Sequence, residues 1–271
     1  MTSLRDIVLH AHSLWPLSGA EDWDTPGLVT GSLDQDVKRI LLAVDAVSLT
    51  VEEAVASEAD LLLTHHPLLL RGITTVNEGA YKGKLISQLI RGNVALLAAH
   101  TNADVVQNGV SDVIAQKLGL TNTSPLTTGT APGTGIGRVG ELPAAITLGD
   151  LARQLAELLP ATAGGIKVSG EYAQQVQRVS LCGGAGDSLL STEGVLGSDV
   201  YITSDLRHHP AQEFREQALL TDGPALIDIA HWAAEWLWLD TAAEQLRSAF
   251  PHIEVVVSDL RTDPWDFVVV Q

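Results

Sequence analysis

The chain has 271 residues, and its 33 Asp and Glu outnumber its 16 Lys and Arg, so the formal net charge is −17. So acidic a protein is not expected to bind nucleic acids or anionic membranes in general, because such binding needs a basic face. The hydrophobic share of 45% is sufficient for a full core and excludes wholesale disorder. The single cysteine, Cys182, cannot form an internal disulfide, which favours a reducing cytoplasm.

The sequence shows no targeting or membrane segment. The first residues lack the apolar stretch of a secretory signal. No apolar run approaches the ~18 residues needed to cross a bilayer. We therefore expect a cytoplasmic protein with no membrane and no long nucleic acid among its partners.

Short apolar runs alternate with amphipathic stretches along the chain, which predicts an α/β fold with mostly parallel sheets. The runs that read as strands are 39–45, 60–64, 94–99, 178–182, 199–203, 225–229 and 253–257. The stretches that read as helices are 50–57 (with Thr50 as its cap), 84–91, 108–118, 148–159, 210–219 and 230–250. Residues 121–137 are rich in Thr, Ser, Pro and Gly, which is typical of a linker or an exposed loop.

Histidines recur where predicted strands end, and ligands of open α/β sheets bind just past such ends. His65 and His66 follow the strand at 60–64. Neighbouring residues on an extended chain point to opposite faces, so these two would normally diverge. At a strand end where Pro67 constrains the preceding residue, both can still border one cavity, and they would then serve two ions rather than chelate one. The alternative is a pair of half-buried histidines at the start of a loop.

A second stretch runs from His100 to Asp104, after the strand at 94–99. Asp104 offers a hard oxygen donor that can bridge two metals, and His100 either binds a metal or braces the site. The alternative is that Asn102 or Asp104 opens a helix as its N-cap.

His231 and Glu235 stand four residues apart on a predicted helix, which places their Cβ atoms about 5–6 Å apart on one face. An imidazole and a carboxylate so placed can share a cation. Trp232 follows His231 where a zincin metalloprotease has glutamate, so that class is disfavoured. The alternative is a solvent-facing pair worth a few tenths of a kcal/mol.

Four further features of the sequence are open to a functional or a structural interpretation. His208 and His209 follow another strand, close to Asp205, and either line the site or begin a helix at the surface. The glycine-rich stretch 183–186 resembles a phosphate-cradling loop without its lysine, or a tight turn. Asp45 either touches the site or caps a helix, and Cys182 is interpreted as a core residue.

Together these stretches resemble the Nif-three-like family, the hexameric proteins with a dinuclear metal centre that are called GTP cyclohydrolase I type 2 homologues. The matching segments run in order along nearly the whole chain: Glu21–Asp24 with Gly27 and Leu28, Ala43–Asp45, Thr64–Pro67, His100–Asp104, Gly137–Gly140, Thr203–Asp205 with His209, and His231–Glu235. Thr25-Pro26, Ala103 and Ser204 depart from the family pattern, and none of them removes a presumed ligand.

The resemblance implies two divalent metal ions per subunit (Zn, Fe, Mn or Ni). It implies that their ligands are His65, His66, Asp104, His231 and Glu235, with the two carboxylates as candidate bridges.

The resemblance also implies two intertwined α/β lobes with mostly parallel sheets and no inserted extra domain. We expect residues 1–125 with 221–271 to form a metal-site lobe, 134–220 to form the second lobe, and 121–137 to link them. A toroidal homohexamer, built as a trimer of dimers, is implied as the assembly.

The function expected is that of a metal-dependent hydrolase of the GTP cyclohydrolase I type 2 kind, acting on a nucleotide or a related small molecule. Two metals ~3.5–4 Å apart make hydroxide available near neutral pH. The candidate proton donors are His100, His208 and His209. Two alternatives stay open: a non-catalytic metal-binding or regulatory ring protein, and a metal-dependent phosphohydrolase.

Overall fold

The structure is a computed structural model that describes residues 2–270. The chain forms two compact units, and each unit takes in two separate stretches of sequence. Unit 1 comprises residues 2–103 and 239–262, and unit 2 comprises residues 104–238 and 263–270. The expected α/β class, with two interleaved lobes and no inserted domain, is confirmed.

The unit boundaries differ from the expected lobes at both ends. Residues 104–125 and 221–238 belong to unit 2 rather than to the lobe that contains residues 2–103. The reason lies in strand pairing and packing: β12 (Ala225–Ile229) pairs with β11 (Val200–Ser204), and α5 (Val110–Lys117) packs against β10 (Gln175–Ala185).

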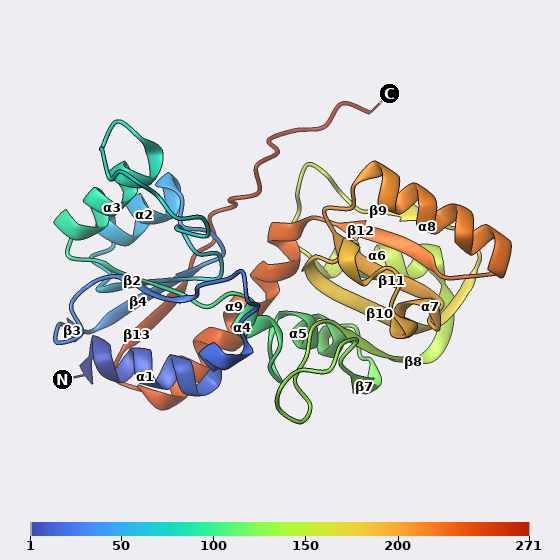
Figure 1. The fold of residues 1–271 in the computed structure, drawn as a ribbon, viewed down its shortest axis with the longest axis horizontal. Helices are drawn as coiled ribbons and strands as arrows, with labels where there is room; N and C mark the ends of the chain where they lie inside the picture. Colours follow the sequence, from blue (N-terminus) through green and yellow to red (C-terminus); the bar gives the residue numbers. More distant parts are fainter. Residues whose placement is uncertain (1, 271) are drawn as a thin grey trace. The chain divides into compact units, whose positions relative to one another are not determined.

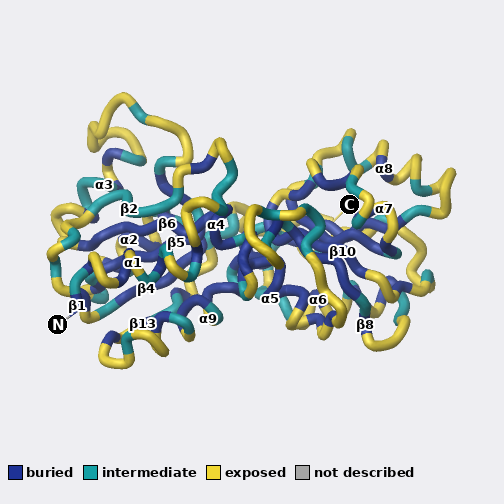
Figure 2. Tube along the Cα trace, turned by 60° about the horizontal axis from the view of Figure 1, so that its bottom comes forward, coloured by how far each residue is buried: buried dark blue, intermediate teal, exposed yellow. Residues whose placement is uncertain are grey.

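Unit 1 is built on a five-stranded sheet. Its strands, in spatial order, are β13 (Glu254–Val257), β4 (Arg39–Ala43), β5 (Leu61–Thr64), β6 (Ala95–Ala98) and β2 (Gly27–Thr30). The first four run parallel, and β2 is antiparallel to β6. The predicted strands of this unit are confirmed to within two residues, because continuous apolar runs of this length are typical of strands buried on both faces. Figure 2 shows β4, β5 and β6 as largely buried, whereas the edge strands β13 and β2 are partly exposed.

Helices cover both faces of this sheet (Figure 1). On one face lie α2 (Ser48–Ala56) and α3 (Tyr81–Arg91), which pack with Leu41, Leu62 and Leu96 in one core cluster. On the other face lie α1 (Leu4–Leu14) and the end of α9 (His231–Ala249), where His10 stacks edge-on against Phe250 at 5.2 Å.

Two helix starts in unit 1 differ from expectation. No helix is predicted at α1 from the sequence, yet Ser3 and Asp6 form a capping box that begins it. Helix α2 begins at Ser48, two residues before the expected cap Thr50. The Thr50 hydroxyl instead accepts from the backbone N–H of Val47 at 3.0 Å and donates to the carbonyl of Asp45 at 2.7 Å.

Unit 2 is built on a six-stranded mixed sheet. Its strands, in spatial order, are β7 (Thr121–Ser124), β8 (Arg138–Thr147), β10, β11, β12 and β9 (Lys167–Ser169). The three central strands, β10 to β12, run parallel, and the outer ones are antiparallel to their neighbours. The expected linker 121–137 is therefore wrong at its start, since its first four residues form the edge strand β7.

Strand β8 is not predicted from the sequence because Gly140 and Pro143 interrupt its apolar pattern. The pairing of β8 with β10 shifts register between Val176 and Arg178, which are opposite Ile146 and Glu141. Pro143 lies in this irregular stretch, where no ladder hydrogen bond is required of it.

The helices of unit 2 pack on both faces of its sheet. Helices α7 (Glu193–Leu196) and α8 (His208–Thr221) enclose a cluster with Cys182 and Tyr201, so the core interpretation of Cys182 is confirmed. Helix α6 (Leu148–Leu158) packs against β8. The remaining short elements are β1 (Thr2–Ser3), η1 (Leu17–Gly19), β3 (Asp36–Val37), α4 (Thr101–Asp104) and η2 (Asp187–Leu189).

A buried arginine holds the loop before β8. The guanidinium of Arg138 donates to Asp112 at 3.0 Å and to the carbonyls of Gly135, Gly137 and Val106 at 2.8, 2.7 and 2.8 Å. Its charge is thus paired and its donors are bonded, which is what burial of an arginine requires.

Within residues 2–270, no helix combines the length and apolar character needed to cross a bilayer.

Candidate metal centre

The two neighbouring histidines of unit 1 follow β5 directly. Their backbone N–H groups continue the ladder to β4, donating to Ala43 and Val44 at 3.1 and 2.8 Å. The Nδ1 of His65 lies 2.9 Å from the carbonyl oxygen of Ala99, and the Nδ1 of His66 lies 2.7 Å from Asp45 Oδ1. A carbonyl oxygen accepts only, so Nδ1 of His65 carries the hydrogen and Nε2 carries the lone pair.

His100 joins these two rings at the end of β6. Its ring centroid lies 5.3 Å from that of His65 and 5.4 Å from that of His66. One possible ligand atom from each of the three residues lies within 4.8 Å of the other two. The three histidines, which follow two separate predicted strands in the sequence, thus form one cluster in unit 1.

Burial and the neighbouring imidazole of His65 lower the pKa of His100 to about 4, despite the carboxylate of Asp24. The Nδ1 of His100 lies 3.0 Å from Asp24 Oδ2. At neutral pH this imidazole is uncharged, which is the form that binds a metal. A charge on it would be costly in a cluster that already gathers three rings.

Asp24 supports this arrangement. It lies in the Glu21–Asp24 stretch, for which the sequence alone indicates no chemical role. Its carboxylate accepts from the hydroxyl and the backbone N–H of Thr101, at 2.6 and 3.2 Å. Burial raises the pKa of Asp24, but the hydrogen bonds from Thr101 and His100 outweigh it and the net shift is downward. Asp24 is therefore an anion that orients His100.

Unit 2 carries the second set of donors, at the start of α9. The Nδ1 of His231 lies 2.7 Å from Asp205 Oδ2, and its Nε2 lies 2.7 Å from Glu235 Oε1. The predicted i,i+4 pair is thus formed. Glu235 is not solvent-facing, because only 3% of its side chain is exposed.

Burial lowers the pKa of His231, but the carboxylates of Glu235 and Asp205 outweigh it and raise it to about 11. The imidazole is therefore a cation between two anions at neutral pH. A divalent ion held by His231 and Glu235 would take the place of the proton between them, and Asp205 would keep its hydrogen bond from Nδ1. The charges present at this position therefore fit a metal.

The glycine-rich stretch lies beside this pair. It forms the bulged end of β10, where the pairing with β11 shifts between Leu181 and Ala185. Gly184 has a φ of +82°, and a Cβ on it would lie 3.0 Å from Glu235 Oε1 and 3.5 Å from His231 Nε2. Glycine is thus needed here for close approach to the His231–Glu235 pair.

Asp104 is the last residue of α4 and the first of unit 2. Burial raises the pKa of the Cys182 thiol to about 12, and the carboxylates of Asp104 and Glu235 add to this shift. Both predicted bridging carboxylates therefore oppose ionisation of the buried Cys182 thiol.

The other two candidate proton donors lie at the start of α8. His208 and His209 are exposed and stack edge-on at 5.2 Å. Within residues 2–270, their two rings contact each other. Their assignment as proton donors stays a prediction.

A common feature links the histidines of both units. In each of these histidines, Nδ1 lies within 3.0 Å of an oxygen atom. For His65 this is the carbonyl oxygen of Ala99. For His66, His100 and His231 it is a carboxylate oxygen of Asp45, Asp24 and Asp205, respectively. This is the usual support of metal-binding histidines, because it sets the ring orientation and directs Nε2 to the ion. Imidazole and carboxylate donors suit Zn, Fe, Mn or Ni.

The fold and these donors define an α/β protein with His and Glu groups that can bind a metal ion. The chain belongs to the Duf34/NIF3 (NGG1p interacting factor 3) family, whose profile matches residues 2–264. This confirms the resemblance on which the expected fold and ligands rest.

Known proteins agree with this assignment along the whole chain. The chain is 45% identical to a GTP cyclohydrolase 1 type 2 homolog of Streptomyces coelicolor, over 98% of this chain and 94% of the relative. It is 32% identical to the Mycobacterium tuberculosis protein of the same name, over 97% and 96%. A Bacillus cereus protein related to NIF3 has the same fold, with a TM-score of 0.88 at 22% identity over 98% and 99%.

Proposed function

We propose that the chain binds two divalent metal ions and hydrolyses a nucleotide or a related small molecule with a water that they activate. The ligands in this proposal are His65, His66, Asp104, His231 and Glu235. The observation that carries it is the oxygen partner of Nδ1 on His65, His66 and His231, which directs Nε2 to a ligand.

Bound metals would polarise a substrate oxygen and supply hydroxide near neutral pH. The chain's own residues prepare for this in two ways. The imidazoles of unit 1 are held in fixed orientations by Ala99 and Asp45. His231 and Glu235 would hold a metal in place of the proton between them, and Asp205 fixes the orientation of the His231 ring.

The low pKa of His100, about 4, favours it as a further nitrogen donor or a hydrogen-bond acceptor over the role of proton donor. An imidazole that binds a proton this weakly is uncharged at neutral pH. His208 and His209 remain the proposed proton donors.

The substrate class in this proposal rests on the relatives, which are named GTP cyclohydrolase 1 type 2 homologs. The opening of a purine imidazole ring is a hydrolysis that metal-activated water can serve. We also propose that the chain assembles with itself into a homohexamer, a trimer of dimers, in the cytoplasm.

The proposal is tested by elemental analysis of the purified protein together with a turnover screen. The screen uses GTP and simple phosphoesters, with native protein, Glu235→Ala and the matched control Glu244→Ala, which alters an exposed carboxylate on the same helix. Two metal equivalents per chain, with turnover of GTP that Glu235→Ala abolishes and Glu244→Ala keeps, are expected.

Other outcomes select the alternatives. Metal-dependent turnover of phosphoesters without GTP would identify a phosphohydrolase. Two metals with no turnover of any substrate would identify a metal-binding or regulatory protein. A folded chain that neither contains metal nor binds added Zn²⁺ would overturn the proposal.

A further inference from the structure

The segment after unit 1 ends is unusually apolar for its exposure. Residues 263–270 belong to no helix or strand. Five of their side chains are exposed by 62–88%: Trp265, Phe267, Val268, Val269 and Val270. Aromatic and β-branched residues in succession favour an extended strand. An exposed apolar stretch of this kind marks an interaction site.

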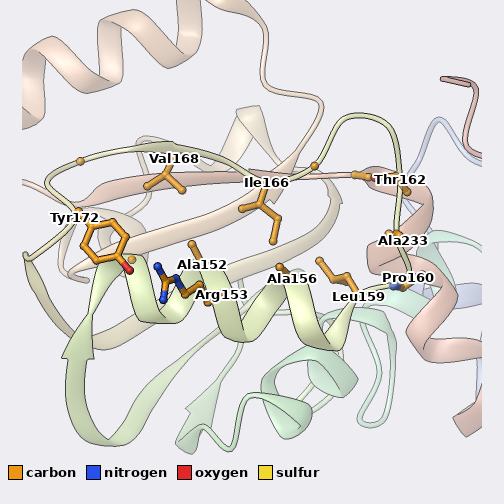
Figure 3. A pocket seen from close by; sticks show the side chains of 15 residues that line it. Ala152, Arg153, Ala156, Leu159, Pro160, Thr162, Ile166, Val168, Tyr172 and Ala233 are labelled. Carbon is orange, nitrogen blue, oxygen red and sulfur yellow. The ribbon is translucent and has the colours of Figure 1, made fainter. Parts of the chain in front are cut away.

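An apolar groove of about 540 Å³ lies on unit 2. Figure 3 shows helix α6 on one side of it, with Ala152, Ala156 and Leu159, and the segment with Ile166 and Val168 on the other. Strand β9, which contains Val168, is an edge strand that pairs with β12 on one side only.

One cation lines this groove. The guanidinium of Arg153 lies 5.7 Å from the ring centroid of Tyr172 at one end of it. Within the described part of the chain, Arg153 forms no ion pair, and no acidic residue lines the groove. An acidic group on an apolar occupant would thus have a partner here.

The segment and the groove match in length and in charge. Helix α6 has 11 residues, which at 1.5 Å each make about 16 Å. Six extended residues, 265–270, span about 20 Å at ~3.3 Å each. The segment carries Asp263 and Asp266 and no Lys or Arg, whereas the groove carries Arg153 and no acid.

We propose that residues 265–270 of one copy of this chain dock in the α6–β9 groove of a second copy. The apolar side chains that begin with Phe267 fill the groove, and Asp266 pairs with Arg153. A second copy is the favoured occupant because each chain carries both the exposed apolar segment and the groove that complements it. The inference rests on the self-association proposed above and is independent of the metal ligands.

Disulfide trapping between two distinguishable chains tests this contact. The chain has a single cysteine, Cys182, which is buried. A tagged chain with Val268→Cys is mixed with an untagged chain with Ala156→Cys and oxidised mildly. The matched control replaces Ala156→Cys with Gln217→Cys, an exposed position on α8. We expect at least about ten times more mixed dimer with the groove cysteine than with the control.

Two results would overturn the inference. One is an equal yield of mixed dimer from both positions. The other is a chain carrying both Val268→Cys and Ala156→Cys that closes on itself and forms no dimer.

A charge exchange gives a second readout. Arg153→Glu should reduce the assembled fraction seen by light scattering, and Arg153→Glu with Asp266→Arg should restore it.

If native protein is assembled but no trapping occurs, this inference fails while self-association stands. If native protein is a monomer, both fail. The metal content of the same samples reports separately on the proposed metal site.

Discussion

His231 and Glu235 place a ring nitrogen and a carboxylate oxygen 2.7 Å apart within one turn of α9. With Asp205 on the other ring nitrogen, the imidazole lies between two anions. The pair is therefore an ion pair in the metal-free chain.

The first prediction concerns the stability of the metal-free chain at alkaline pH. Burial lowers the pKa of His231, yet Glu235 and Asp205 raise it to about 11, above its ordinary value of 6.5. The resulting stability is fully present below pH 6.5 and is lost as the pH rises toward 11. Urea unfolding with EDTA should show the difference in unfolding free energy between native protein and His231→Gln shrinking from pH 6 to 10.

The control for this pH dependence is His208→Gln, which alters an exposed ring. Its difference from native protein should stay constant over the same range. A constant difference for His231→Gln as well would contradict the assigned ion pair.

The second prediction concerns the carboxylates behind the histidines. Asp45→Ala and Asp205→Ala should each weaken Zn²⁺ binding by about 10–100-fold, because the ring they hold loses its orientation and basicity. Competition with a chromogenic chelator measures this affinity. Asp240→Ala, which removes an exposed carboxylate from α9, should leave it unchanged. Equal affinities for all three variants would show that Asp45 and Asp205 do not support metal ligands.

The third prediction concerns Gly184. Gly184→Ala places a methyl group 3.0 Å from Glu235 Oε1 on a backbone with a φ of +82°. The left-handed backbone alone should cost about 1–2 kcal/mol of unfolding free energy, and the displaced Glu235 should weaken Zn²⁺ binding. Chemical denaturation and metal titration measure the two effects. Gly72→Ala, where a Cβ meets no atom within 4 Å, is the control and should change neither.

The fourth prediction concerns the buried ion pair of unit 2. Arg138 and Asp112 have side chains exposed by only 3% and 11%. Arg138→Met leaves the buried carboxylate of Asp112 without its positive partner and removes the guanidinium donors from three carbonyls, so we expect a loss of about 3–5 kcal/mol in unfolding free energy. The exposed pair of Arg178 and Glu141, whose charged atoms lie 3.7 Å apart, should lose less than about 1 kcal/mol on Arg178→Ala. Similar losses for both variants would contradict the structural role of Arg138.

The sequence predicts the central strands and the histidine positions well, for a common reason. Continuous apolar runs such as 60–64 are recognisable as buried strands, and their ends are where parallel sheets place ligands. That physical rule identifies His65, His66 and His100 before any coordinates. The rule does not predict that His100 is uncharged at neutral pH. Its pKa is low because the ring is buried beside His65, which only the folded structure shows.

Features that depend on pairing between distant segments were not predictable in this way. The support of His66 by Asp45 joins two strand ends that are 21 residues apart. The need for glycine at 184 arises from Glu235, more than 50 residues later. Strand β8, with Gly140 and Pro143, is defined by its partners β7 and β10 rather than by its own propensity.

Because residues 239–262 of unit 1 follow residues 104–238 of unit 2 and precede its residues 263–270, no uninterrupted fragment contains either unit without part of the other. A truncation after residue 238 would remove the edge strand β13 from the sheet of unit 1. It would also remove the second half of α9 and Phe250, which stacks against His10 of α1. Neither unit can therefore be obtained alone by cutting the chain at one point. Dissecting them would require a circularly permuted gene that joins residue 262 to residue 2.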